Sequence, residues 1–199
     1  MRVLIGCEYS ATVREAFKSR GHDAVSCDID HGTDIDGAHY LGDMFDMLCL
    51  PWDLIIAHPP CTALTVAGNS TYGAGKPKHH MRLEAAAWTE KLWYAALKAS
   101  PRVCFENPVG VLGRFSSLPK ATFVHPWQHG HLEQKKTGLF LHNLPALVPT
   151  YDVHDAMMRL PVNKRQRLHY LPPSPDRWKI RSVTFPGIAA AMADQWGAL

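Results

Sequence analysis

A cysteine that follows two prolines is the first feature of this 199-residue chain that could do chemistry. In the stretch WDLIIAHPPCTALT, from Trp52 to Thr65, an apolar run ends on Pro59, Pro60 and Cys61. A thiolate is a strong nucleophile, and prolines would stiffen the turn that projects it. The alternative is a plain strand exit, because cysteine is often buried as a small apolar group. Packing is the role expected for the four other cysteines, Cys7, Cys27, Cys49 and Cys104.

The elements that must position Cys61 alternate between strand and helix patterns. Short apolar runs predict strands over residues 2–6, 24–27, 54–57, 103–105 and 138–141. Helical spacing and composition predict helices over residues 11–20, 82–99 and 187–196, and residues 68–80 read as a loop. This alternation predicts an α/β fold of Rossmann-like type, with a mostly parallel sheet and helices on both faces. Residues 1–199 are expected to form a single domain.

The carboxyl ends of the strands in such a sheet form one ligand-binding edge. Reactive or small residues follow most of the predicted strand ends: Gly6 to Ser10, Asp28 to Asp30, Asp43, Cys61, and Glu106 to Asn107. An acid at the end of the second strand typically holds the ribose hydroxyls of a cofactor, and Asp28 is preferred to Asp30 for this role. The first turn lacks GxGxxG, which favours a cofactor with a ribose but no pyrophosphate.

Together these residues resemble the S-adenosylmethionine-dependent DNA cytosine C5 methyltransferases. Pro59-Pro60-Cys61 resembles the Pro-Cys catalytic motif of that family, and Glu106-Asn107 resembles its Glu-Asn motif. Gly42-Asp43 resembles the Gly-Asp pair that touches the cofactor adenine, and TFPGIAAAMADQWG resembles the final helix. The order and approximate spacing of the motifs agree over nearly the whole chain, so the resemblance implies the methyltransferase form of the fold.

The resemblance also implies roles for particular residues. Cys61 would add to carbon 6 of cytosine, Glu106 would hydrogen-bond ring nitrogen 3 and the exocyclic amine, and a methyl group would pass from S-adenosylmethionine to carbon 5. The implied cofactor-binding residues are Gly6, Ser10, Asp28, Ile29, Asp43 and Pro59. The expected substrate-binding residues are Pro60, Asn107, Lys76, Lys78, Gln134, Lys136, Arg165 and Arg167.

The chain departs from this family in three places. The glycine-rich first motif is reduced to IGCEYSA, and Gly138 stands where the family has a second arginine in its Gln-Arg motif. Only a short segment, residues 142–181, occupies the position of the family's large target-recognition domain. We therefore expect either short and relaxed sequence recognition or a partner protein that supplies it. The compact form is typical of phage or prophage enzymes.

Two basic stretches favour a nucleic-acid substrate. Between Arg159 and Arg181 seven Lys or Arg residues stand against one Asp, a net charge of +6. The loop over residues 68–82 combines glycines with Lys76 and Lys78, so it is suited to close over a base flipped out of duplex DNA. A solvated surface segment is the alternative for each stretch. The same chemistry on RNA or a free cytosine nucleotide, and a methyltransferase fold that binds without turnover, also remain open.

The twelve histidines do not form a recognised metal motif. His79-His80 and His129-x-His131 are the nearest clusters, and neither has a second pair at zinc spacing, so no metal is predicted. His58 could polarise Cys61, line the base pocket or simply be a hydrogen-bonded loop residue. No apolar run reaches the length of a membrane span, which favours a cytoplasmic protein of a bacterium or a phage-infected cell.

Overall fold

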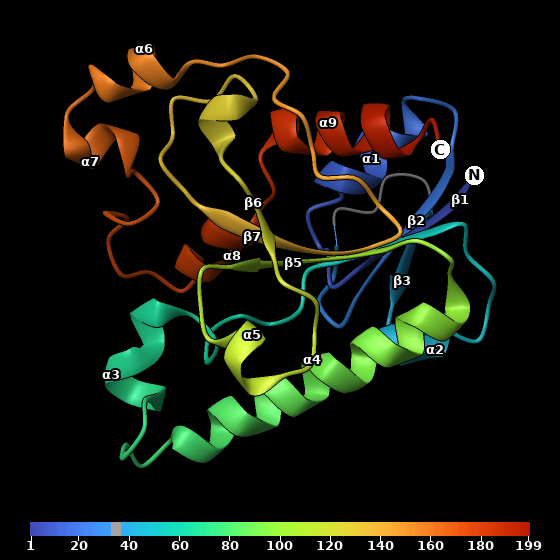
Figure 1. Ribbon diagram of the computed structural model, residues 1–199, viewed down its shortest axis with the longest axis horizontal. Helices are drawn as coiled ribbons and strands as arrows, with labels where there is room; N and C mark the ends of the chain where they lie inside the picture. The colour runs from blue at the N-terminus through green and yellow to red at the C-terminus, as the bar shows by residue number, and fades with distance from the viewer. Residues whose placement is uncertain (33–36) are drawn as a thin grey trace.

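The computed structural model describes residues 1–32 and 37–199, and in these residues a seven-stranded sheet forms the centre of the molecule (Figure 1). Its strands are β1 (Arg2–Gly6), β2 (Asp23–Asp28), β3 (His39–Leu41), β4 (Leu54–Ala57), β5 (Val103–Pro108), β6 (Thr122–Val124) and β7 (Thr137–His142). They lie in the order β3-β2-β1-β4-β5-β7-β6, and β7 runs antiparallel to both of its neighbours. The other pairs are parallel, so the predicted mostly parallel sheet is confirmed.

Helices cover both faces of the sheet, as expected. The α-helices are α1 (Thr12–Lys18), α2 (Met44–Met47), α3 (Asn69–Tyr72), α4 (His79–Ala99), α5 (Leu112–Phe115), α6 (His154–Met158), α7 (Val162–Arg165), α8 (Arg177–Ser182) and α9 (Pro186–Trp196). Short 3-10 helices lie at η1 (Val66–Gly68) and η2 (Pro126–Gln128). Figure 1 shows α4 and α2 on one face and α1 and α9 on the other. Among the described residues, no helix is both long and apolar enough to cross a bilayer.

Each face of the sheet carries its own apolar core. Beneath α4, the ring of Trp93 meets the ring of Phe105 edge-on, with centroids 5.0 Å apart. On the opposite face, α1 and α9 bury Phe17 and Trp196 completely. Burial on both faces explains why β4 reads as a continuous apolar run rather than an alternating one.

Several boundaries differ from the sequence-based expectations. The strand predicted to stop at residue 105 continues to Pro108, because β7 pairs with Glu106, Asn107 and Pro108. The helix predicted from Arg82 begins at His79, and the predicted loop over 68–80 contains α3. The connection after β2 lies partly outside the described residues, at positions 33–36.

The turn after β1 contains non-glycine residues in a backbone conformation that normally favours glycine. Cys7 and Ala11 have φ angles of 55° and 57°, in the left-handed region that normally favours glycine. Between them, the buried Glu8 carboxylate accepts the backbone N–H groups of Val13 and Arg14 at 2.7 and 3.2 Å, and so caps the start of α1. The reduced first motif is thus replaced by a side-chain cap and two strained residues.

Candidate active site

The turn that carries Cys61 is held to two neighbouring strands. The backbone N–H of His58 donates to the carbonyl of Gly6 at 2.9 Å, which extends the β1–β4 pairing by one residue. The side-chain amide of Asn107, only 1% exposed, donates to the carbonyl of Pro59 at 3.1 Å. Asn107 was expected to bind substrate, but the structure places it beneath the turn. The two bonds fix the backbone directly before Cys61.

The chain after Cys61 turns back and is anchored from α4. The Cys61 carbonyl accepts the N–H groups of Leu64 and Thr65 at 2.9 and 3.0 Å. Arg82, only 3% exposed, donates to the carbonyls of Ala63 and Thr65 at 2.7 and 3.2 Å. Arg82, at the end of the stretch over residues 68–82, therefore does not add to a basic loop surface, because its guanidinium is used inside the fold.

Glu106 and His58 form a buried pair beside this turn. The Nδ1 atom of His58 lies 3.1 Å from Oε2 of Glu106, and the two side chains are 9% and 14% exposed. Burial works to raise the pKa of Glu106, but the His58 hydrogen bond and the nearby charge of Lys135 outweigh it and hold that pKa below its ordinary value. Glu106 is therefore a carboxylate near neutral pH. Although sequence reasoning placed Glu106 after a strand end, it lies within β5 and lines a small pocket.

The Cys61 thiol is close enough to Glu106 to feel its charge. Burial and the Glu106 carboxylate raise the pKa of Cys61, and the charges of Lys135 and Arg181 lower it by a smaller amount. The resting group is therefore a thiol rather than a thiolate at neutral pH. Cys61 and Glu106, which are 45 positions apart in the sequence, meet in one electrostatic environment.

Lys135 and Arg181 influence the Cys61 thiol but were not predicted as site residues, although Lys135 lies in a stretch, Gln134-Lys135-Lys136, that resembles the start of the family's Gln-Arg motif. Lys135 lines a pocket with Glu106, Thr184 and Phe185, and its ammonium donates to the carbonyl of Arg181 at 3.2 Å. The sequence singled out the flanking Gln134 and Lys136 instead. Consecutive side chains of an extended segment point to opposite sides, so only one parity can face the site, and the sequence alone did not indicate which.

The flanking residues have partners elsewhere. Gln134 accepts the side-chain amide of Gln166 at 3.0 Å, and the ammonium of Lys136 lies 3.9 Å from the ring centre of Phe123. Arg165 donates to the carbonyl of Met158 at 3.1 Å. Arg167 pairs with Glu133 at 3.4 Å. Gln134, Lys136, Arg165 and Arg167 therefore organise the segment from β6 to α7.

The expected cofactor residues lie at the ends of β1 and β2 and at the start of α2. The Asp28 carboxylate accepts the N–H of Asp30 at 2.9 Å, and the side chain of Ile29 is 82% exposed. Asp43 caps α2 by accepting the N–H of Phe45 at 3.0 Å. The Ser10 hydroxyl lies 3.4 Å from the Glu8 carboxylate. Pro59 is buried and Pro60 is exposed.

The helix α8 reaches this cofactor end from the basic segment. The ammonium of Lys179 lies 3.0 Å from Asp30 Oδ2, and the Tyr9 hydroxyl donates to the Lys179 carbonyl at 2.7 Å. Trp178 packs against Tyr9 with ring centres 5.9 Å apart. One short helix thus contacts the first turn, the acidic end of β2 and, through Arg181, the Cys61 site.

The donor set at the end of β2 fits a nucleoside-type cofactor. A carboxylate such as Asp28 can accept both hydroxyls of a ribose, and an exposed apolar side chain such as Ile29 offers a face to an adenine ring. At Gly6, a Cβ atom would lie 2.0 Å from Sδ of Met44, so a larger residue at this strand end would require the Met44 side chain to move.

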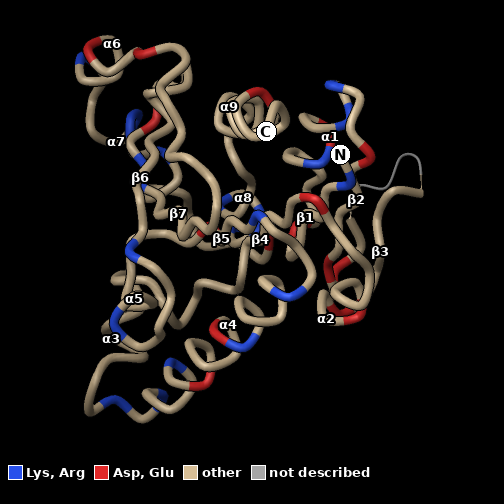
Figure 2. The backbone as a smooth tube through the Cα atoms, turned by 45° about the vertical axis from the view of Figure 1, so that its right-hand side comes forward, with Lys and Arg blue, Asp and Glu red and all other residues tan. Residues whose placement is uncertain are grey.

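Charged residues gather in particular parts of the fold. Figure 2 shows Asp and Glu around β2, β3 and α2, and Lys and Arg on the side that carries α3 and the start of α4, with further Lys and Arg around α1 and the N-terminus. Lys76 and Lys78, in the loop between α3 and α4, are both exposed. The predicted lid loop therefore presents basic side chains close in the chain to the Cys61 turn.

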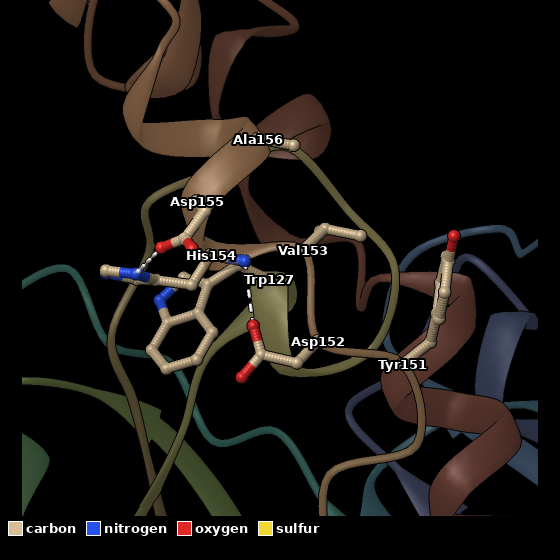
Figure 3. Close-up of a pocket in the computed structure, with 7 residues that line it drawn as sticks. All are labelled: Trp127, Tyr151, Asp152, Val153, His154, Asp155 and Ala156. Carbon is tan, nitrogen blue, oxygen red and sulfur yellow. Dashed lines mark hydrogen bonds and ion pairs between the residues drawn. The ribbon is translucent and has the colours of Figure 1, made fainter.

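A separate surface hollow lies away from these residues. It is lined by Trp127, Tyr151, Asp152, Val153, His154, Asp155 and Ala156 (Figure 3). Its polar groups are already engaged with one another, since Asp152 accepts the N–H of His154 at 2.8 Å and His154 Nδ1 lies 3.4 Å from Asp155 Oδ1. Within residues 1–32 and 37–199, no group of three His, Cys, Asp or Glu side chains is arranged to hold a metal ion.

Comparisons with known proteins reveal similarity only at the level of structure. No family model matches the chain, and no curated protein matches it. The methyltransferase EhMeth of Entamoeba histolytica is 12% identical over 76% of this chain and 57% of its own, with a TM-score of 0.52. A prophage-encoded E. coli protein, provisionally assigned as a DNA modification methyltransferase, is 14% identical over 81% of this chain and 56% of its own, with a TM-score of 0.41.

This chain covers less than three fifths of the length of either solved structure. At such low identity the likeness is one of fold. The fold is a Rossmann-like α/β fold with a mostly parallel sheet and an antiparallel β7, similar to that of EhMeth.

Proposed function

We propose that this protein transfers a methyl group from S-adenosylmethionine to carbon 5 of cytosine in DNA, through a covalent adduct between Cys61 and carbon 6. The observation that carries the proposal is the placement of the Cys61 thiol within the field of the buried Glu106 carboxylate, at adjacent strands of a methyltransferase fold. A nucleophile beside a hydrogen-bonding acid is what addition to a pyrimidine ring requires.

The residues around Cys61 support an addition that is coupled to proton movement. Carbon 5 of cytosine is a poor nucleophile, so the thiol sulfur first bonds to carbon 6 and its electron pair enriches carbon 5. Because the pKa of Cys61 is raised, little thiolate is present before substrate binds. Glu106 would hydrogen-bond ring nitrogen 3 and the exocyclic amine, which stabilises the charge that develops on the ring. Asn107, through its hydrogen bond to the Pro59 carbonyl, would keep the Cys61 sulfur positioned next to the base.

S-adenosylmethionine, when bound, supplies an electrophilic methyl group on a sulfonium. Asp28 would accept the ribose hydroxyls, and Ile29 would pack against the adenine. Gly6 and Pro59 would form the close walls between cofactor and base. The ion pair of Lys179 with Asp30 would keep α8 over this end of the site.

DNA is the proposed substrate because basic groups lie next to the site and along the segment that follows. Lys76 and Lys78 on the loop after Cys61 would contact phosphates while the loop closes on an extruded base. Residues 142–181 would supply further backbone contacts and limited sequence recognition.

Transfer of a labelled methyl group is the direct test. The protein is incubated with radiolabelled S-adenosylmethionine and duplex DNA, RNA or dCMP, and we expect label in DNA. Wild-type protein should also form a denaturation-resistant complex with DNA that contains 5-fluorocytosine, because the C5 fluorine cannot leave as a proton does. We expect Cys61→Ser to abolish both transfer and trapping. Cys49→Ser is the matched control, since Cys49 is an exposed cysteine outside the site.

The outcomes separate the alternatives. Label in RNA or dCMP alone would move the proposal to those substrates. Transfer by Cys61→Ser at the wild-type rate would refute the covalent mechanism, and absence of transfer and trapping with every substrate would favour a fold that binds without turnover.

A further inference from the structure

His58 lies beside a buried carboxylate. Its Nδ1 atom is 3.1 Å from Glu106 Oε2, and Glu8, only 4% exposed before the start of α1, is close enough to influence the charge of His58. Within the described part of the chain, Nε2 of His58 is buried and has no hydrogen-bond partner.

The charges that face His58 come from each element packed around it: Glu106 on β5, Glu8 after β1 and Lys135 before β7. The Glu106 carboxylate stabilises an imidazolium at His58, and Glu8 adds to this only when it is ionised, because burial raises the pKa of Glu8. Burial works against protonation, but the Glu106 hydrogen bond and the charges of Glu106 and Glu8 outweigh it and raise the pKa of His58.

We propose that His58 is a positioning residue that acts through Glu106 by storing the proton that nitrogen 3 of the cytosine needs. The inference rests on the proposed cytosine chemistry and adds the source of its proton. Glu106 alone is ionised near neutrality and has no proton to give, whereas the His58–Glu106 pair holds one proton that can move between the two side chains.

The proton balance closes over the cycle. The Cys61 thiol gives its proton to solvent as its sulfur bonds to carbon 6, and nitrogen 3 takes the proton that His58 Nδ1 passes on through Glu106. After carbon 5 has been methylated, its hydrogen leaves to solvent as a proton, and the sulfur leaves carbon 6 as a thiolate that takes up a proton again. Nitrogen 3 then returns its proton through Glu106 to His58, so the pair ends as it began.

The test compares the pH dependence of single-turnover methyl transfer in wild type and His58→Asn. Asparagine keeps a hydrogen-bond donor near Glu106 but cannot store a proton. The control is His129→Asn, because His129 is also buried, bonds through Nδ1 to Thr150 at 3.0 Å and leaves Nε2 without a partner among the described residues. Thermal unfolding of all three proteins confirms that they fold.

In wild type the rate should rise about tenfold per pH unit while Cys61 ionises and the pair keeps its proton. Above the pKa of His58, loss of that proton cancels the gain in thiolate, so the profile bends and levels. In His58→Asn only Glu106 can hold the proton, so the bend in the pH–rate profile moves below the neutral range. The plateau rate of this variant should be about a hundredfold lower than that of wild type, since the ordinary pKa values of His and Glu are about 6.5 and about 4.3. His129→Asn should keep the wild-type bend.

A titration by NMR tests the stored proton without any substrate. The His58 imidazole signal, assigned by its absence from His58→Asn, should titrate above about pH 6.5 in wild type and lower in Glu106→Gln. A midpoint below the ordinary value in wild type, or one unchanged in Glu106→Gln, would overturn the proposal. An unchanged bend in an active His58→Asn would refute only the role of His58, whereas absence of transfer and trapping in wild type refutes the proposed function itself.

Discussion

At the scale of single residues, the surroundings of Cys61 keep the proposed nucleophile in its protonated, less reactive form. The carboxylate that would assist addition also raises the pKa of the Cys61 thiol, and burial adds to the effect. Exposed thiolates are prone to oxidation and exchange, so a protonated resting thiol is protected until substrate binds. The substrate would then complete the environment, because a base hydrogen-bonded to Glu106 reduces the repulsion between the carboxylate and the sulfur.

Because the Glu106 carboxylate raises the pKa of the Cys61 thiol, we predict that Glu106→Gln makes Cys61 more reactive toward a small reagent while abolishing methyl transfer. Removing the negative charge lowers the pKa of the thiol, so alkylation by iodoacetamide at neutral pH should quicken about three- to tenfold. Mass spectrometry of the Cys61 peptide measures the rate, and the exposed Cys49 in the same sample is the internal control. Slower alkylation of Cys61 in Glu106→Gln would show that Glu106 does not oppose ionisation.

The sequence indicated Cys61 and Glu106 as a candidate pair but not their surroundings. Each was singled out because it follows an apolar run and because the two motifs resemble a known pair. The partnership of His58 with Glu106 depends on the register between β4 and β5, and the approach of Arg181 depends on how α8 folds back. Neither fact is encoded in local residue patterns, so the site's electrostatics required the structure.

At the scale of elements, the chain after Cys61 is tied to the chain after Glu106. Thr65 and Gly110 form an antiparallel bridge, and Val111 donates its N–H to the carbonyl of Leu64 at 2.8 Å. The two segments therefore set the separation of thiol and carboxylate together. A Cβ atom on Gly110 would lie 2.1 Å from the Leu64 carbonyl oxygen, which is backbone and cannot swing away.

We expect Gly110→Ala to push these segments apart. It should lower the free energy of unfolding by about 1–3 kcal/mol, as overpacking typically does, and it should reduce methyl transfer beyond any loss of folded protein. Gly113→Ala is the matched control, because its Cβ would make only an ordinary contact with Phe140 at 3.9 Å, within α5. Urea unfolding and single-turnover rates measure the two effects. If the two variants had the same unfolding free energy and the same transfer rate, the Thr65–Gly110 bridge would not set the separation of thiol and carboxylate.

Long or strongly patterned elements were predictable, whereas short ones were not. The strands β1 and β4 and the helices α4 and α9 were found because their apolar runs or helical composition extend over enough residues. The strands β3 and β6 have three residues each, too few for a period to emerge. The extension of β5 ran against local propensity, since Pro108 lacks an N–H, and only pairing with β7 at the strand end accommodates it.

At the scale of the whole molecule, the two ends of the proposed active site carry opposite charge. The acidic groups lie around β2, β3 and α2, where the cofactor ribose would bind, and the basic loop between α3 and α4 follows Cys61 in the chain (Figure 2). Such a division would repel DNA phosphates from the cofactor end and attract them to the base end. It offers orientation of the duplex without a large recognition domain.

This division predicts which lysines set the salt dependence of DNA binding. Replacing Lys76 and Lys78 by Gln should weaken binding to any duplex and lower the slope of log K against log salt by about 0.9 for each phosphate that the loop no longer neutralises. Lys98→Gln is the control, because Lys98 is exposed at the opposite end of α4, about 30 Å along the helix. Fluorescence anisotropy over a salt series measures the slopes. If Lys98→Gln lowered the slope as much as the double variant does, binding would follow overall charge, and the basic loop would lose its assigned place on the DNA.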